Sequence, residues 1–145
     1  MSSKGPGQLC FINGTVNAQK YQNILEEHLI PSIQQFGSMN ELIFQQDGAS
    51  CHTAKSTKKW LDDNGNGMTV MDWPSSSPDL NPIENLWGNI KRKLRINRPK
   101  TVQELKNKIE LIWSQISTEE CANLYNSMGK RMRCVIKAKG DVTQF

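Results

Sequence analysis

Short apolar segments of strand character alternate with helical segments along the first half of the chain, and this order constrains the fold more than any other feature. Strands are predicted over residues 8–15, 41–46 and 68–73, and the second of them is expected to be buried. A helix with Tyr21 on its apolar face, continuing to Phe36, is predicted between the first two strands, and a shorter helix over residues 53–61 precedes the third. Strands that alternate with helices form sheets covered by helices. We therefore expect one mixed α/β domain over residues 1–145, whose sheet has few strands and an edge without partners.

Three further helices are predicted in the second half, where apolar residues recur at helical spacing. The first begins after Asn81 with Pro82 in its first turn, and the second is opened by the capping-box pair Thr101 and Glu104. The third runs from about Ser117 through Val135 as one helix. The expected apolar faces of the first two helices are Ile83, Leu86, Trp87, Ile90 and Leu94, and then Val102, Leu105, Ile109, Ile112, Trp113 and Ile116.

Composition excludes several classes of protein. The 145 residues, of which 37% are hydrophobic and 22% charged, suffice for a soluble domain with its own core. Apolar runs are only a few residues long, so we expect no membrane span and no signal peptide. The four cysteines are widely spaced and only two histidines accompany them, which argues against a zinc site and for reduced thiols in the cytosol or nucleus.

The basic residues are concentrated in two segments, although the net charge is only +4. Residues 91–100 and 130–139 hold eleven of the eighteen lysines and arginines and no acid. One such run is typical of a solvated helix face, but two runs favour a polyanionic partner, most simply nucleic acid. The first run comprises Lys91, Arg92, Lys93, Arg95, Arg98 and Lys100, and the second Lys130, Arg131, Arg133, Lys137 and Lys139.

Two carboxylates are candidates for a metal site. Asp47 follows a predicted strand and Glu84 lies near the start of a helix, with 36 residues between them (84 − 47 − 1), enough for a helix and a strand to return the chain to the same sheet edge. Carboxylate oxygens there are suited to Mg²⁺ or Mn²⁺. The plainer alternative is that Asp47 and Gly48 form a turn and that Glu84 is the capping partner of Asn81.

Two segments resemble the catalytic domain of Tc1/mariner transposases. One runs from Trp73 to Trp87 and contains Pro-Asp-Leu-Asn-Pro-Ile-Glu-Asn-Leu-Trp, and the other is Phe44-Gln-Gln-Asp-Gly-Ala-Ser-Cys-His-Thr53. The resemblance extends from about Ser2 to the end of the chain. It implies an RNase H-like fold and a triad of acids that binds two divalent metal ions, Mg²⁺ or Mn²⁺. It also implies cleavage of DNA at transposon ends, joining of the freed 3′-hydroxyl to target DNA, and a nuclear location.

The resemblance assigns roles to individual residues. Asp47 matches the second acid and Glu84 the third, so both are expected to be catalytic and to bind metal. His52 matches a histidine usual after the second acid, and Asn85 lies beside the third, so both are expected to support the site. The basic run over residues 91–100 would then contact DNA phosphates.

The chain also departs from the family pattern. The interval between Asp47 and Glu84 is longer than is usual in the Tc1 group, and Gly48 and Cys51 make the neighbourhood of Asp47 slightly unusual. The family's first acid lies on an earlier strand, whereas the first acid here is Glu26, in a predicted helix. We therefore expect an amino-terminally truncated domain that lacks the first strands, the first acid and the paired helix-turn-helix region, with an incomplete metal site and little activity alone.

Two alternatives remain open. The chain could be a non-catalytic module, derived from a transposase, that binds DNA or protein. It could also fold only as a homo-oligomer, or with a partner that supplies the missing strands, because an exposed sheet edge favours association.

Overall fold

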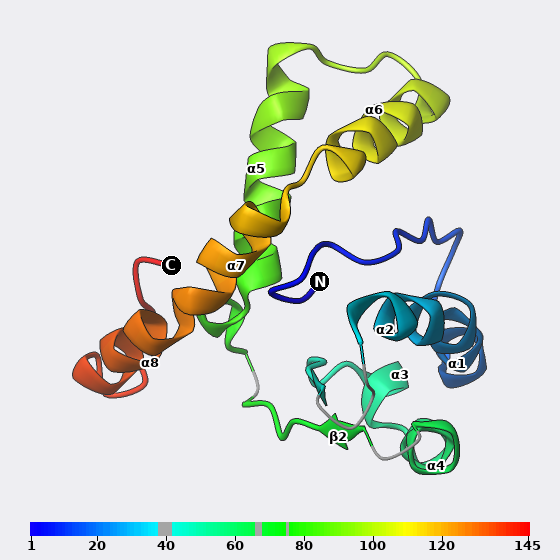
Figure 1. Ribbon diagram of the computed structural model, residues 1–145, viewed down its shortest axis with the longest axis vertical. Helices are drawn as coiled ribbons and strands as arrows, with labels where there is room; N and C mark the ends of the chain where they lie inside the picture. The colour runs from blue at the N-terminus through cyan, green and yellow to red at the C-terminus, as the bar shows by residue number, and fades with distance from the viewer. Residues whose placement is uncertain (38–41, 66–67, 75) are drawn as a thin grey trace. The chain divides into compact units, whose positions relative to one another are not determined.

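The computed structural model describes residues 1–37, 42–65, 68–74 and 76–145. They form two compact units, which are described separately (Figure 1). The strand unit comprises Gly7–Ser76, and the helical unit comprises Met1–Pro6 with Ser77–Phe145. In the described part of the chain, no helix has the length and apolar character needed to span a membrane.

The strand unit begins its regular structure with a long, modified helix. The side chain of Asn17 accepts a hydrogen bond from the Lys20 N–H and so caps α1 (Ala18–Ile24). A π-helical segment, η1 (Leu25–Leu29), connects α1 to α2 (Ile30–Phe36). Pro31 has no N–H to donate within a regular helix, and the wider turn directly before it accommodates this loss without ending the helix.

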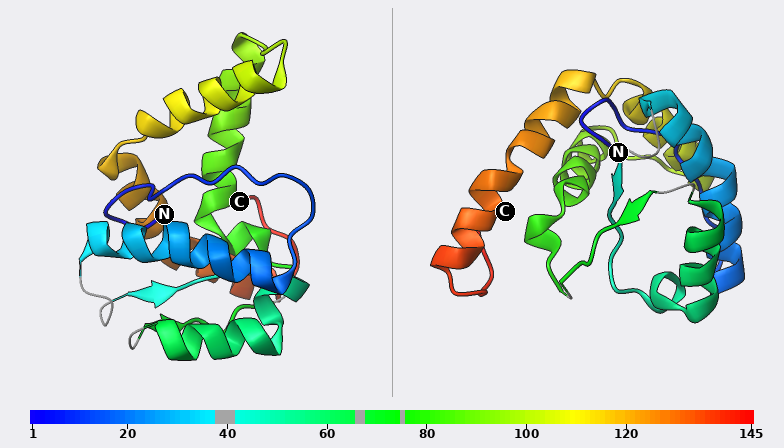
Figure 2. Two further views of the ribbon diagram at one scale, coloured as in Figure 1. Left: turned by 90° about the vertical axis from the view of Figure 1, so that its right-hand side faces the viewer. Right: turned by 60° about the horizontal axis from the view of Figure 1, so that its bottom comes forward.

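Two parallel strands follow, and a helical segment connects them. β1 (Ile43–Phe44) pairs with β2 (Thr69–Val70), so that Ile43 is opposite Thr69 and Phe44 is opposite Val70, and the strands lie side by side (Figure 2). The connection contains α3 (Ser50–Thr53) and α4 (Lys55–Asn64). The expected strand–helix–strand order is confirmed here, but the strands are shorter than predicted.

Two expectations about the strands are wrong. Residues 8–15 form no strand, because among the described residues this segment has no ladder partner; its Gln8 N–H donates instead to Ser32 Oγ on α2 at 2.9 Å. The second predicted strand is not fully buried, since Ile43 is 62% exposed. Glu41, at the start of that predicted strand, lies outside the described residues.

The core of the strand unit lies among its helices. Leu25, Ile33, Phe36 and Leu61 are its buried apolar residues. Thr57 on α4 is completely buried, and its hydroxyl donates to the Cys51 carbonyl of α3 at 2.7 Å. This bond satisfies a buried hydroxyl and connects α4 to the segment that carries Asp47 and His52.

The helical unit confirms the predicted helices with one division. After the 3₁₀ turn η3 (Pro78–Leu80) come α5 (Pro82–Ile96) and α6 (Val102–Ser114), joined at one end in Figure 1. The predicted last helix is two helices, α7 (Thr118–Asn126) and α8 (Met128–Lys137). They separate at Ser127, whose hydroxyl donates to the Leu124 carbonyl and accepts from Arg131 Nε, so the residue at the break bonds to the helix on each side of it.

The core of this unit confirms most of the predicted apolar faces. Leu86 and Ile90 of α5 are buried with Ile116 and Cys121, and the indole rings of Trp87 and Trp113 stack with centroids 5.5 Å apart. Further side chains that pack against this core are Ile83, Leu94, Ile109, Ile112 and Leu124. Val102 is an exception: it occupies the first position of α6 beside the connecting loop, and it is 72% exposed.

Candidate functional site

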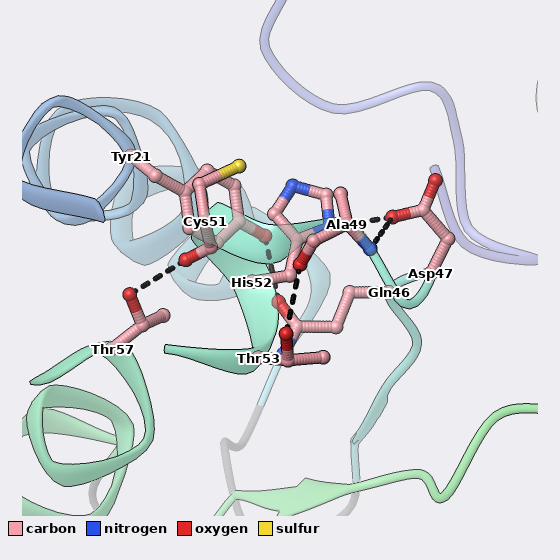
Figure 3. Close-up of polar contacts among 8 residues, drawn as sticks. All are labelled: Tyr21, Gln46, Asp47, Ala49, Cys51, His52, Thr53 and Thr57. Atoms are coloured by element: carbon pink, nitrogen blue, oxygen red, sulfur yellow. Dashed lines mark hydrogen bonds and ion pairs between the residues drawn. The ribbon is translucent and has the colours of Figure 1, made fainter. Parts of the chain in front are cut away.

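Asp47 is presented directly after strand β1 by a turn that its own side chain closes. Asp47 lies three residues past the end of β1. Its Oδ1 accepts a hydrogen bond from the Ala49 N–H at 3.0 Å (Figure 3). This side chain-to-backbone bond is the geometry of an Asx turn. It orients the carboxylate while leaving the side chain 62% exposed. The turn interpretation of Asp47 is therefore correct, and it is compatible with a site, because the same turn fixes the direction of the carboxylate.

His52 closes on Asp47 from helix α3. Its Nδ1 lies 2.7 Å from Asp47 Oδ1, and the His52 side chain is 21% exposed. The backbone N–H of His52 donates to the Ala49 carbonyl at 2.9 Å, so the same turn positions both residues. The buried Nδ1 is close to the carboxylate but not aligned with it as a linear hydrogen bond. The short spacing of Asp47 and His52 in the sequence thus corresponds to direct contact.

Tyr21 completes this cluster, and the sequence indicated only that it lies on the apolar face of a helix. Its ring lies against the His52 imidazole with centroids 4.1 Å apart, and its hydroxyl donates to Gln46 Oε1 at 2.8 Å. Burial raises the pKa of Tyr21, and the nearby Cys51 and Asp47 raise it further. The hydroxyl therefore stays a neutral donor, and Tyr21 holds residues on both sides of the turn (Figure 3).

Glu84 lies in the first turn of α5, in the helical unit, and its side chain is exposed. The capping alternative for Glu84 is not confirmed, because the N-cap residue Asn81 makes no side-chain capping bond. Within the described residues, no hydrogen bond or ion pair engages the Glu84 carboxylate. A carboxylate at a helix amino terminus interacts favourably with the helix dipole, and here its oxygens also remain open to a ligand.

Asn85, the other residue predicted to support the site, points into the helical unit. Its Oδ1 accepts a hydrogen bond from the Arg131 guanidinium at 2.6 Å. Arg131 is only 2% exposed, so the prediction that the second basic run faces a polyanion is wrong for this residue. The sequence of a basic run does not reveal which of its side chains is buried, so it predicts surface charge at Arg131.

The first basic run is exposed as predicted. Its first four residues lie on the carboxy-terminal half of α5, and Arg98 and Lys100 lie in the following loop. Arg92 donates to Asn89 Oδ1, one turn earlier on the same helix. In the part of the chain that the structure describes, no acidic side chain forms an ion pair with the side chains of this run. All six side chains are exposed, namely Lys91, Arg92, Lys93, Arg95, Arg98 and Lys100.

The donor set is compatible with a hard divalent cation. Asp47 and Glu84 each present an exposed carboxylate, the ligand type that Mg²⁺ and Mn²⁺ prefer. The two residues belong to different units, and the described residues contain no group of three histidine, cysteine, aspartate or glutamate side chains close enough to hold an ion. Each unit by itself therefore contributes one candidate ligand.

Comparison with known proteins identifies the family. Residues 1–106 match the family described as DDE superfamily endonuclease. The Tc3 transposase of Caenorhabditis elegans is 34% identical over 92% of this chain and 40% of its own length, and the Tc1 transposase of the same organism is 33% identical over 99% of this chain and 52% of its own. The chain thus spans about half the length of these relatives.

Solved structures show the same fold. The catalytic domain of Mos1 mariner transposase has a TM-score of 0.79 at 22% identity, over 90% of this chain and 66% of that one. A Mos1 paired-end complex with Mg has a TM-score of 0.82 at 22% identity, over 98% of this chain and 42% of that one. The fold is accordingly RNase H-like. The chain belongs to the DDE endonuclease superfamily, and within it to the Tc1/mariner transposase catalytic domains.

Proposed function

We propose that this chain supplies the second and third acids of a metal-dependent site that cleaves DNA strands and transfers them in transposition. The observation that carries the proposal is the Asp47 turn, in which a backbone N–H holds an exposed carboxylate three residues past a parallel strand, with His52 Nδ1 2.7 Å from it. The carboxyl ends of such strands are where open α/β folds hold ligands. The Mos1 relative was solved as a strand transfer complex and as a paired-end complex with Mg, which supports DNA as the substrate.

Asp47 and Glu84 would hold Mg²⁺ or Mn²⁺ through their carboxylate oxygens. A divalent ion at such a site stabilises the charge that develops on phosphate oxygens during strand cleavage. His52 keeps Asp47 in the turn, and the Tyr21 ring keeps the imidazole in place. We therefore assign His52 and Tyr21 the role of orienting the carboxylate before it meets the ion.

We further propose that these 145 residues do not cleave DNA alone. The first acid of the chain is Glu26, which lies with Glu27 on the π-helical segment, exposed. Neither residue follows a strand, so neither is placed like the first acid of the family. A third carboxylate, from residues outside these 145 or from another polypeptide, would complete the site. Assembly as a homo-oligomer, or with a partner that supplies the missing strands, would cover the exposed sheet edge.

A manganese titration followed by NMR tests whether Asp47 and Glu84 share an ion. Mn²⁺ broadens the signals of nuclei close to it, so both residues should broaden over the same Mn²⁺ concentrations. Asp47→Asn should then raise the concentration that broadens Glu84, whereas Asp62→Asn, on the exposed surface of α4, should leave it unchanged. If the Glu84 signals broaden at the same Mn²⁺ concentration in Asp47→Asn as in the wild-type chain, the shared site is contradicted.

A second candidate function, DNA binding without catalysis, is favoured by the unpaired basic run on α5. The affinity of a protein for DNA falls with salt in proportion to the phosphates it neutralises. Neutralising three residues of the run should reduce the magnitude of the negative slope of log K against log salt by about 2 to 3. The variant is Lys91→Gln with Arg92→Gln and Lys93→Gln; its matched control, with the same charge change on α4, is Lys55→Gln with Lys58→Gln and Lys59→Gln.

A plasmid-nicking assay with Mg²⁺ or Mn²⁺ tests whether these 145 residues cleave DNA alone. DNA binding that survives Glu84→Ala, without nicking by the wild-type chain, agrees with either function. Nicking by the wild-type chain that Asp47→Ala abolishes would refute the proposed need for a third carboxylate. A DNA substrate also supports a nuclear location, which tagged protein in cells would test.

A further inference from the structure

The start of helix α5 is held by a side chain from another helix rather than by its own cap. Asn81 occupies the N-cap position without a side-chain capping bond, and Pro82 has no N–H to offer. Glu84 follows within the same turn. A helix end without its own cap is free to fray unless tertiary contacts fix it.

Arg131 on α8 supplies these contacts. Its guanidinium donates to the Asp79 carbonyl at 2.8 Å and to Asn85 Oδ1 at 2.6 Å. Its Nε donates to Ser127 Oγ at 2.8 Å, which anchors the guanidinium on its own helix. Asp79 precedes the N-cap and Asn85 directly follows Glu84. One side chain therefore bonds to the backbone before residues 81–84 and to the Asn85 side chain after them.

The surroundings of Arg131 hold its guanidinium in place. The side chain is 2% exposed, and its guanidinium carbon lies 4.8 Å from the centre of the Phe145 ring. Asp79 is fixed in turn, because its Oδ2 accepts from the Thr143 hydroxyl at 2.9 Å. Burial lowers the pKa of Arg131 and the Asp79 carboxylate opposes this, but a guanidinium remains charged in proteins.

Stability alone is a weak explanation for such a residue. Burying a charge is unfavourable unless it is fully hydrogen-bonded, and apolar residues of similar volume often stabilise a protein as well or better. A planar group with donors in fixed directions is, however, well suited to setting geometry. The groups that Arg131 fixes are those that flank Glu84.

We propose that Arg131 is a positioning residue, which orients the first turn of α5 so that Glu84 can bind a metal ion. The proposal rests on the proposed function, in which Glu84 is a metal ligand. Arg131 acts through Asp79 and Asn85 and touches neither the ion nor the DNA. The carboxy-terminal helix α8 thereby becomes part of the apparatus of the site.

The test compares Arg131→Lys with Arg133→Lys, the same substitution at an exposed position of the same helix. Lysine keeps the charge but cannot reach both partners with a planar fork. Loss of one hydrogen bond to a charged group should speed amide hydrogen exchange at Leu86 and Trp87 about tenfold. Exchange in α6 should stay unchanged, which a general loss of stability would not allow. Arg133→Lys should alter neither region.

The second readout is the Mn²⁺ concentration that broadens the Glu84 signals. Substituting a residue that orients a metal ligand typically lowers metal affinity about tenfold or more. Broadening of the Glu84 signals in Arg131→Lys should therefore require about ten times more Mn²⁺ than in the wild-type chain. If Arg131→Lys does not fold, Asn85→Leu removes one of the two contacts and should produce the same pattern. Asn85→Asp, which keeps an acceptor oxygen for Arg131, should restore slow exchange.

The outcomes separate the two proposals. If Mn²⁺ broadens Glu84 equally in wild type and Arg131→Lys, the positioning role is refuted while the metal site stands. Uniformly faster exchange in α5 and α6 would reduce Arg131 to a stabilising residue and also refute it. If Mn²⁺ fails to broaden Glu84 in the wild-type chain, the proposed function and the positioning role fall together.

Discussion

Thr57→Val should destabilise the strand unit by removing one buried hydrogen bond. The side chain is completely buried, and its hydroxyl donates to the Cys51 carbonyl at 2.7 Å. Removing the donor costs about 1 to 3 kcal/mol when the acceptor stays buried. Valine has nearly the same volume, so it leaves no cavity, and its additional methyl recovers about 0.8 kcal/mol. We therefore expect a net loss of about 0.2 to 2.2 kcal/mol, or about 1 kcal/mol at the middle of this range.

Thr53→Val is the matched control, because the substitution is the same and the side chain is exposed. Its hydroxyl donates to the Ala49 carbonyl at 3.2 Å, on the surface. Surface substitutions usually change stability by less than about 0.5 kcal/mol. The comparison isolates the burial of the Thr57 hydroxyl from the general effect of replacing threonine with valine.

Urea titration followed by the indole N–H signals in NMR provides the assay. Trp60 lies on α4 in the strand unit and Trp113 on α6 in the helical unit, so each unit has its own reporter. With a slope of about 1 to 1.5 kcal/mol per M of urea, Thr57→Val should lower the Trp60 midpoint by about 1 M. A shift no larger than that of Thr53→Val would refute the argument that this buried bond connects α3 to α4.

Three further predictions concern the helical unit. Leu86→Ala should destabilise it by about 2 to 5 kcal/mol, measured at the Trp113 signal, because the fully buried side chain leaves a cavity. Hydrogen bonds from the Lys100 N–H and then from Lys108 lower the pKa of Glu104. The stabilisation that the Glu104 carboxylate gives is therefore complete above the ordinary carboxyl pKa and is lost as pH falls through the lowered pKa. The difference in stability between the wild-type chain and Glu104→Gln should then vanish in acid titrations. Burial raises the pKa of the fully buried Cys121 thiol, so a thiol reagent should label Cys121 only after unfolding.

Much of the helical architecture follows from local sequence. Thr101 caps α6 as predicted, since its hydroxyl oxygen accepts from the Glu104 N–H at 3.0 Å. The apolar residues of α5 recur at helical spacing, and Leu86 and Ile90 lie in the core as expected. Such features depend on residues three or four positions apart, which the sequence shows directly.

Strands depend on partners that are distant in the sequence, and two of the predictions about strands were wrong. Residues 8–15 have the composition of a strand but no ladder partner among the described residues, and their backbone bonds to Ser32 instead. Ile43 lies in a strand yet is largely exposed. A strand exists only through its neighbour, and its propensity depends strongly on that context.

The sequence by itself determined where most of the helices lie, the Thr101 cap of α6 and the family motif, including the two carboxylates Asp47 and Glu84. Only the tertiary structure decided which polar groups meet: Tyr21 on His52, and Arg131 on the loop before Glu84. The physical reason is that a basic or aromatic side chain has the same local signature whether it faces solvent or the core. Burial and hydrogen-bond partners, which come from segments up to 52 residues apart, assign its role.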